Sequence, residues 1–241
     1  MGTSRILATS GGFIATDRWA VMEPGGNMRE LLRLTGKQRP RLTLVMTASG
    51  DDRSYLTRAY AAFRGWSVEV THLELFSQPN TDPRTLLMNS DAIWVGGGSV
   101  ANLLAVWRVH GLETILREAW SDGIVLGGVS AGSICWHVGG TTDSFGPELV
   151  PVTNGLGLLP YGNGVHYDSE AQRRPLLHET VRDQVLPLSY ATDDGIGILY
   201  EGIDAVEVVA DRSATEAAAY RIEKSREQVI ETRLPVGRIS G

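Results

Sequence analysis

Short apolar runs alternate with amphipathic segments over the first two-thirds of the chain. An apolar run that ends in glycine or polar residues is typical of a buried strand, and apolar positions at helical spacing are typical of a helix packed on a sheet. The pattern predicts strands at residues 5–10, 41–48, 67–75, 91–95 and 124–129. It predicts helices at residues 27–35, 53–63, 83–88, 100–108 and 112–120.

Strands that alternate with helices are joined by right-handed crossovers and form a mostly parallel sheet with helices on both faces. After residue 185 the pattern changes to short strands at 188–192, 197–200, 205–209, 217–222 and 229–234, which we interpret as β-hairpins that extend or cover the sheet. We find no linker, repeat or low-complexity tract. The fold class is therefore α/β with C-terminal β-hairpins, and we expect residues 1–241 to form a single domain.

Composition and charge narrow the function. The hydrophobic fraction is 42%, the charged fraction 21% and the net charge −6, so the chain has no basic surplus for binding nucleic acid or an anionic membrane. The one cysteine, Cys135, excludes an internal disulfide. We see neither a signal peptide nor an apolar run that could span a bilayer, and we expect a cytoplasmic protein. No residue pattern indicates a metal or another cofactor.

The segment Gly128-Val129-Ser130-Ala131-Gly132 matches the pattern G-x-S-x-G between a predicted strand and a predicted helix. In that context the glycines allow a tight turn that exposes the serine hydroxyl above the sheet, beside the N-terminus of a helix. The helix N-terminus supplies N–H groups and a positive dipole that favour a developing oxyanion. Ser130 is therefore a candidate nucleophile. A plain turn that caps a helix is the alternative interpretation.

A serine hydroxyl needs a base, normally histidine. His166 ends the strand-like segment 158–165 and precedes a polar run, which places it at a strand end where a base is expected. His137 follows Ser130 by seven residues, and two turns of a continuing helix would carry it about 10 Å from the hydroxyl. The other histidines lie in a predicted strand, in a turn between helices and in a helix predicted at 170–182: His72, His110 and His178.

The third member of such a site is an acid that orients the imidazole. Asp194 belongs to the run Asp193-Asp194-Gly195 after the predicted strand 188–192, although Asp-Gly is also a common hairpin turn. Asp143 and Asp168 are the alternatives, and the residues alone leave the choice open. An α/β-hydrolase has its acid before its histidine, so the order found here does not fit that fold.

Several blocks of sequence together resemble a known family. They are Trp94-Val95-Gly96-Gly97-Gly98, Leu103-Leu104, the serine motif followed by Cys135-Trp136, and Gly164-Val165-His166 ahead of Arg173. From about residue 5 to 209 the chain resembles the aspartyl dipeptidase (peptidase E) group of serine peptidases, which is related to cyanophycinase. The resemblance implies an α/β domain similar to the class I glutamine amidotransferases, with serine in place of their cysteine.

Residue by residue, the resemblance implies that Ser130 is the nucleophile, His166 the base and Asp194 the acid, with Asp143 as the alternate acid. It also implies an oxyanion hole formed by the N–H groups of Gly98 and Ala131.

The candidate substrate-binding residues are Ser99, Arg173 and Arg174. The chain departs from the family pattern at two points. Many relatives have asparagine where Ser99 stands, and the substrate-reading arginine ahead of a pair like Gln172-Arg173 is replaced by an acidic or small residue. The resemblance therefore does not carry strict Asp-X specificity to this chain.

We expect a serine exopeptidase, similar to dipeptidase E, that hydrolyses short peptides through an acyl-enzyme. A small serine carboxypeptidase, an esterase and a non-catalytic binding protein on the same scaffold are the alternatives. A thiol enzyme is disfavoured because Cys135 lies five residues past the motif, where we expect it to be buried. The expected partner is a short peptide, and Trp107 or Trp120 is the candidate contact in a homo-oligomer.

Overall fold

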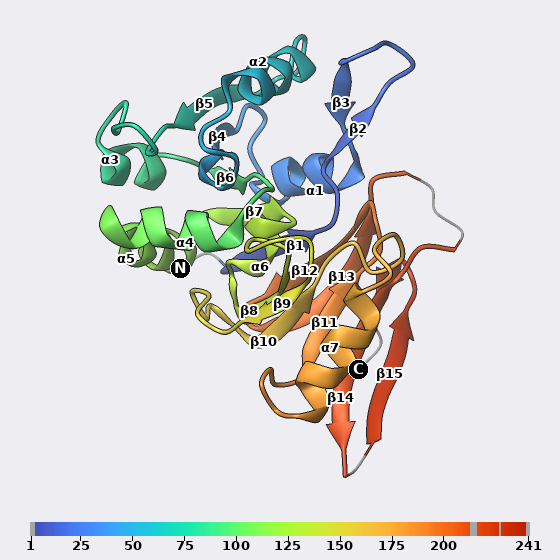
Figure 1. Ribbon diagram of the computed structural model, residues 1–241. Coiled ribbons are helices and arrows are strands. Elements are labelled where there is room, and N and C mark those ends of the chain that lie inside the picture. Colours follow the sequence, from blue (N-terminus) through green and yellow to red (C-terminus); the bar gives the residue numbers. More distant parts are fainter. Residues whose placement is uncertain (1–2, 213–215, 227, 240–241) are drawn as a thin grey trace.

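The computed structural model describes residues 3–212, 216–226 and 228–239 and contains two large sheets (Figure 1). The main sheet has eight strands in the order β16-β13-β12-β1-β7-β6-β4-β5. Their bounds are β1 (Arg5–Thr9), β4 (Arg41–Val45), β5 (Glu69–Leu73), β6 (Ala92–Val95), β7 (Val125–Val129), β12 (Ile196–Glu201), β13 (Asp204–Ala210) and β16 (Gly237–Arg238). The adjacent strands β1, β7, β6, β4 and β5 are parallel to one another. Strands β12, β13 and β16 are antiparallel to their neighbours.

Helices cover both faces of the main sheet because its buried strands are apolar on both sides. In β4, Leu42 and Leu44 face a core shared with α1 (Gly26–Leu34) and α2 (Arg53–Ala62). On the opposite face, Val45 joins the core of α4 (Val100–Val109) and α5 (Leu112–Ser121). A short helix, α3 (Pro83–Met88), packs on α5.

The second sheet has six strands in the order β15-β14-β11-β10-β8-β9. Their bounds are β8 (His137–Thr142), β9 (Val150–Val152), β10 (Leu159–Gly164), β11 (Ser189–Thr192), β14 (Ala219–Ser225) and β15 (Gln228–Leu234). Of these, β8, β10 and β11 are parallel, and α7 (Arg173–Arg182) covers one face through Leu177 and Val181. The hairpin β14–β15 extends away from the main sheet at the bottom of Figure 1.

Aromatic side chains join the two sheets. Tyr200 of β12 is fully buried, and its ring contacts His137 of β8 and Tyr190 of β11, both at 5.8 Å between centroids. Tyr161 of β10 stacks on it at 6.2 Å. Burial lowers the pKa of His137 to about 4, because an imidazolium would lose its hydration there. The two sheets therefore share one core.

The expected fold class is confirmed: a large, mostly parallel sheet carries helices on both faces, and the C-terminal hairpins β12–β13 and β14–β15 are present. The pattern did not show that β8 to β11 would build a second sheet. It also missed the short hairpin of β2 (Phe13–Ala15) and β3 (Met22–Pro24). The helix predicted at 170–182 begins at Arg173, because Pro175 fits a first helical turn but would break a helix interior.

The continuing helix expected after Ser130 was wrong. The helix α6 (Ala131–Ile134) lasts one turn, and His137 begins strand β8. Glycines and β-branched residues follow in the sequence His-Val-Gly-Gly-Thr-Thr, and these residue types disfavour a helix. His137 is fully buried and its Nδ1 is 2.9 Å from the Ser133 carbonyl oxygen, so it lies away from solvent and substrate.

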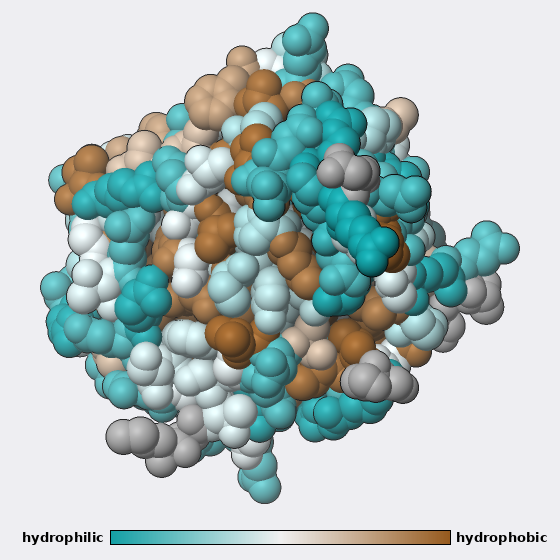
Figure 2. All heavy atoms as spheres, turned by 90° about the horizontal axis from the view of Figure 1, so that it is seen from below, coloured by the Kyte–Doolittle hydropathy of each residue, from teal (hydrophilic) through white to brown (hydrophobic). Residues whose placement is uncertain are grey.

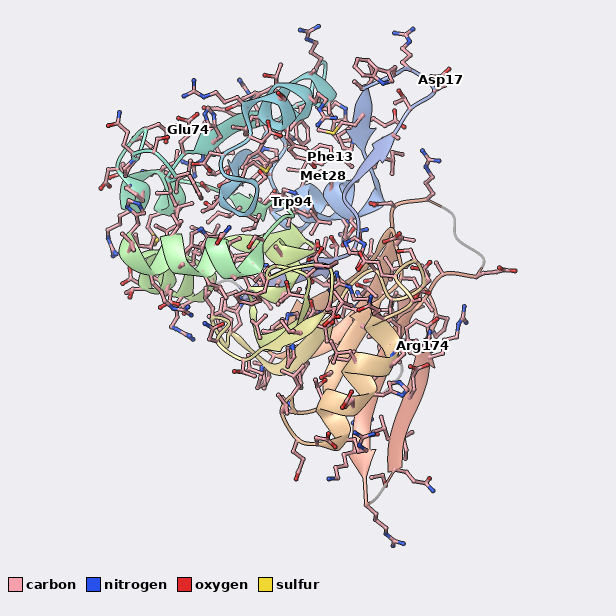
Figure 3. The ribbon with its side chains drawn as sticks, in the orientation of Figure 1. Phe13, Asp17, Met28, Glu74, Trp94 and Arg174 are labelled. Carbon is pink, nitrogen blue, oxygen red and sulfur yellow. The ribbon has the colours of Figure 1, made fainter. Side chains whose placement is uncertain are left out.

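Tryptophans serve the interior more than the surface. Trp107 is fully buried and donates a hydrogen bond to Thr47 Oγ1, so its expected role in a contact between copies was wrong. Trp120 is half-buried, and that prediction stays a prediction. Trp94 lies beside Met28 and Phe13 at the centre of Figure 3.

The surface shows no single dominant apolar area from below. Figure 2 shows apolar patches interspersed with hydrophilic side chains over this face. Across the described ranges, none of the helices has both the length and the apolar character needed to cross a membrane.

Candidate active site

Ser130 stands on a sharp turn between β7 and α6, with φ 56° and ψ −113°. Such a backbone conformation is strained for a residue with a side chain, and it is held here by close packing. A Cβ added to Gly128 would lie 2.4 Å from the Gly132 carbonyl oxygen, and one added to Gly132 would lie 2.2 Å from the Val95 carbonyl oxygen. Both glycines of the motif are therefore required, because neighbouring backbone atoms leave no room for a side chain at this turn.

His166 and Asp194 come from adjacent parallel strands of the second sheet. His166 follows β10 by two residues and Asp194 follows β11 by two residues, and Gly164 is paired with Ala191 at the ends of these strands. The two side chains meet just beyond the ends of these strands, where His166 Nδ1 is 2.5 Å from Asp194 Oδ1. With Nδ1 bound to the carboxylate, Nε2 is the nitrogen that can accept a proton.

Two further contacts hold this pair in place. The Asp194 N–H donates to Asp168 Oδ1 over 2.9 Å. The His166 N–H donates to Ser10 Oγ over 3.1 Å, and Ser10 Oγ is 2.7 Å from Thr192 Oγ1. Ser10 follows β1 of the main sheet, so its hydroxyl links His166, which follows a strand of the second sheet, to the main sheet. Sequence reasoning missed Ser10, because nothing in its local pattern indicates a partner so far along the chain.

The neighbouring carboxylates are placed differently. Asp193 is buried and accepts hydrogen bonds from the Ala218 N–H and the Tyr220 hydroxyl, and burial raises the pKa of its carboxyl. Asp143 lines a pocket together with Ser144, Ser130 and His166. Among the hydrogen bonds of the described residues, His166 makes its side-chain contact with Asp194 and not with Asp143.

A pocket of about 320 Å³ opens in front of the serine. Both sheets contribute to its wall, as does the glycine loop that follows β6. The lining residues are Gly98, Ser99, Ser130, Asp143, Ser144, His166, Glu170 and Arg173. Six residues that the sequence singled out (Gly98, Ser99, Ser130, Asp143, His166 and Arg173) are thus brought together.

Gly98 and Ala131 have unused N–H donors near Ser130. Within the described part of the chain, neither N–H donates a hydrogen bond to another protein group. Gly98 has φ 133°, and a Cβ there would lie 2.3 Å from the Ala48 carbonyl oxygen. A Cβ on Gly97 would lie 3.3 Å from the Ser130 Cβ, so the glycine loop approaches the serine closely. Both N–H groups are therefore available to a ligand.

The polar candidates for substrate binding differ in position. Ser99 lines the pocket and also caps α4, since its Oγ accepts from the Asn102 N–H over 3.2 Å. Arg174 lies outside the pocket. Its guanidinium stacks on Tyr167 and Tyr220 and pairs with Glu231 of β15, on the side of α7 that faces β14 and β15 (Figure 3).

Arg173 is buried in the pocket wall with 3% of its side chain exposed. Its Nε donates to Glu170 over 2.7 Å, and a terminal nitrogen donates to the Thr141 carbonyl oxygen over 2.6 Å. The guanidinium thus has protein partners already.

The described residues do not indicate a thiol nucleophile or a metal cluster. Cys135 is fully buried and burial raises the pKa of its thiol well above the usual range, which opposes a thiolate nucleophile. Over residues 3–212, 216–226 and 228–239, no group of three or more His, Cys, Asp or Glu side chains is arranged to hold a metal ion.

Known proteins resemble this chain in sequence and in fold. The model of peptidase family S51 matches residues 6–208. A Bacillus subtilis protein named "Uncharacterized peptidase YgaJ" is 38% identical over 234 residues, which is 96% of this chain and 97% of that protein. Peptidase E of Shewanella denitrificans is 27% identical over 168 residues, covering 66% and 69%. The crystal structure of a peptidase from an acI-B1 Actinobacterium has a TM-score of 0.69 at 16% identity, covering 99% and 97%, and shows the same fold.

Proposed function

Because this chain belongs to peptidase family S51 and is therefore a peptidase, we propose that it is a serine exopeptidase that hydrolyses short peptides. Ser130, His166 and Asp194 form its catalytic triad. The observation that carries the proposal is the contact of 2.5 Å between His166 Nδ1 and Asp194 in a pocket that also contains Ser130 on its strained turn. A carboxylate on Nδ1 fixes the tautomer in which Nε2 takes the serine proton.

The reaction proceeds through an acyl-enzyme. Ser130 Oγ attacks the carbonyl carbon of the scissile peptide bond and its proton passes to His166 Nε2. The carbonyl oxygen becomes an oxyanion that accepts hydrogen bonds from the N–H groups of Gly98 and Ala131. The C–N bond breaks, and the leaving amine takes the proton from His166. Water then repeats these steps on the Ser130 ester and releases the acid.

The size of the pocket supports a short substrate. Its volume of about 320 Å³ is near the lower end of the range for ligand pockets, roughly 300 to 1,000 Å³. A peptide of two or three residues can fill such a space.

The test is hydrolysis of a panel of short peptides by the unsubstituted protein and by Ser130→Ala, measured by mass spectrometry. We expect Ser130→Ala to reduce kcat on the order of 10⁴- to 10⁶-fold, because the nucleophile is removed. Ser121→Ala, at the exposed end of α5, is the matched control and should leave kcat unchanged. Turnover that survives in Ser130→Ala would refute the serine mechanism.

The same panel separates the alternatives. Peptides with a blocked amino or carboxyl end show which terminus the enzyme requires, and a demand for a free carboxyl end alone would favour a carboxypeptidase. Turnover of esters without turnover of any peptide would favour an esterase. Peptide binding without turnover of either would favour a binding protein.

A cytoplasmic location is part of the proposal. Its support is the single cysteine, which allows no internal disulfide and is typical of proteins in reducing compartments. Cell fractionation with an antibody to the protein tests it, and recovery outside the cytoplasmic fraction would contradict it.

A further inference from the structure

Two carboxylates face the pocket without a part in the proposed reaction. Asp143 and Glu170 both line it, together with Ser130 and His166. The Asp143 side chain is exposed to the pocket and accepts no hydrogen bond from a described residue. It is therefore a charged acceptor that is available to a ligand.

The segment that carries Asp143 is fixed to its surroundings. Thr142 Oγ1 is 2.8 Å from Ser144 Oγ and accepts from the Ser144 N–H over 3.1 Å. Ser144 Oγ also accepts from the Ala101 N–H at the start of α4, over 3.4 Å. Thr142 itself ends β8 and is buried. The backbone position of Asp143 is thus set by the second sheet and by α4.

The one cation among the lining residues is already compensated. The buried Arg173 is paired with Glu170 and bound to the Thr141 carbonyl oxygen. The lining therefore holds two carboxylates against one guanidinium, with Asp143 left uncompensated. An acidic group on a ligand would meet this negative wall and find no free guanidinium, whereas an ammonium group would be attracted to it.

Resting on the proposed function, we propose that Asp143 binds the free α-amino group of the substrate, and that the acidic wall selects a neutral or basic first residue over an acidic one. The substrates are then short peptides with a free amino terminus, such as Ala-X and Lys-X, and Asp-X is disfavoured. Glu170 contributes by holding the Arg173 guanidinium, which could otherwise bind an acidic side chain.

The first test measures binding without turnover, by calorimetry on Ser130→Ala. The ligands are Ala-Leu, Lys-Leu, Asp-Leu and N-acetyl-Ala-Leu, which share the second residue. We expect acetylation to weaken binding of Ala-Leu about tenfold or more, because the charged partner of Asp143 is lost. Lys-Leu should bind at least about tenfold more tightly than Asp-Leu. Equal affinities for the free and the acetylated peptide would overturn the role of Asp143.

The second test uses Asp143→Asn and Glu170→Gln in the same Ser130→Ala background. Asp143→Asn should abolish the preference for the free amine. Glu170→Gln should improve binding of Asp-Leu relative to Lys-Leu, because it removes a charge and releases Arg173. The control Glu179→Gln removes the same charge from an exposed site on α7 and should leave both ratios unchanged. Because each readout is a ratio of two ligands, general loss of folded protein does not imitate it.

Failure of this inference and failure of the proposed function are distinguishable. Turnover of free and acetylated peptides at equal rates by the protein with Ser130 intact would leave the peptidase proposal standing and refute the amine site. Selective binding of the free amine with no turnover of any peptide would support the amine site and refute the exopeptidase.

Discussion

At the scale of single residues, the contact from His166 Nδ1 to Asp194 separates two carboxylates that the sequence left as alternatives. Asp194 contacts Nδ1 of the imidazole and is not among the residues that line the pocket, whereas Asp143 lines it. A carboxylate behind the ring fixes the tautomer of the base, while one on the substrate side can only act on the ligand. The two aspartates should therefore affect different kinetic constants.

We predict that Asp194→Asn lowers kcat on the order of 10⁴-fold, because an amide stabilises the wrong imidazole tautomer. Asp143→Asn should raise KM for free peptides and lower kcat far less. Steady-state kinetics of both variants on one Ala-X peptide measures the difference. If Asp143→Asn lost more of kcat than Asp194→Asn, the assignment of the acid would be wrong.

Sequence reasoning found the residues whose motifs are local. Ser130 stood out because its glycines and the flanking strand and helix are adjacent in the chain, and His166 because it ends a strand. Ser10 and Glu170 carried no such signal. Ser10 accepts a hydrogen bond from a residue 156 positions away in the chain, and Glu170 forms an ion pair with the buried Arg173. Arg173 and Arg174 are neighbours in sequence, yet only the first reaches the pocket.

At the scale of elements, the turn between β7 and α6 depends on the absence of side chains. The Gly132 α-carbon packs directly on the backbone of β6, where the obstacle is a carbonyl oxygen that cannot rotate away. A side chain at this position must displace either the strand or the helix that follows the serine. The nucleophile would move with it.

We predict that Gly132→Ala destabilises the protein by about 1 to 3 kcal/mol through overpacking and also abolishes most of kcat. Urea unfolding and peptide hydrolysis measure the two effects. The comparison variant is Gly36→Ala, whose φ of 66° imposes strain but whose added Cβ meets nothing within 4 Å. It should cost stability at unchanged kcat. Full activity in Gly132→Ala would show that the turn tolerates a shift of the backbone.

Elements with strong periodicity were predictable, and short ones were not. The strands of the parallel sheet and helices α1 to α5 match the predicted ranges within a few residues, because each buries an apolar face of regular spacing. The three-residue strands β2 and β3 are too short to show a period. Strand β8 contains two adjacent glycines, which hide its β pattern and left the second sheet unrecognised.

At the scale of the whole molecule, the two sheets meet at His137 and the tyrosines around Tyr200. The folded state lowers the pKa of His137 to about 4, whereas the ordinary value is about 6.5. Between these pH values the unfolded chain binds a proton that the folded chain does not. The stability contributed by the neutral imidazole is therefore present above pH 6.5 and is lost as the pH falls toward 4.

We predict that His137→Phe flattens the pH dependence of the unfolding free energy in this window. The slope should decrease by up to about 1.4 kcal/mol per pH unit, the contribution of one proton. Urea unfolding at several pH values from 4 to 7, at constant ionic strength, measures the slope even if the variant is less stable overall. An unchanged slope would mean that His137 takes up no proton on unfolding in this range.

That residues 1–241 form one domain stays a prediction.

The site takes its residues from both sheets, so it is complete only after both parts of the chain have been synthesised. The serine turn leaves the ribosome with the five parallel strands of the main sheet, and Asp194 follows 64 residues later (194 − 130), after His166. At about 5 to 20 residues per second, that interval lasts roughly 3 to 13 s. Strand β12, which pairs with β1, comes later still. If the proposed triad is the catalytic one, a nascent chain carries its nucleophile without a working base, and a product terminated before residue 194 would add no peptidase activity to the cell.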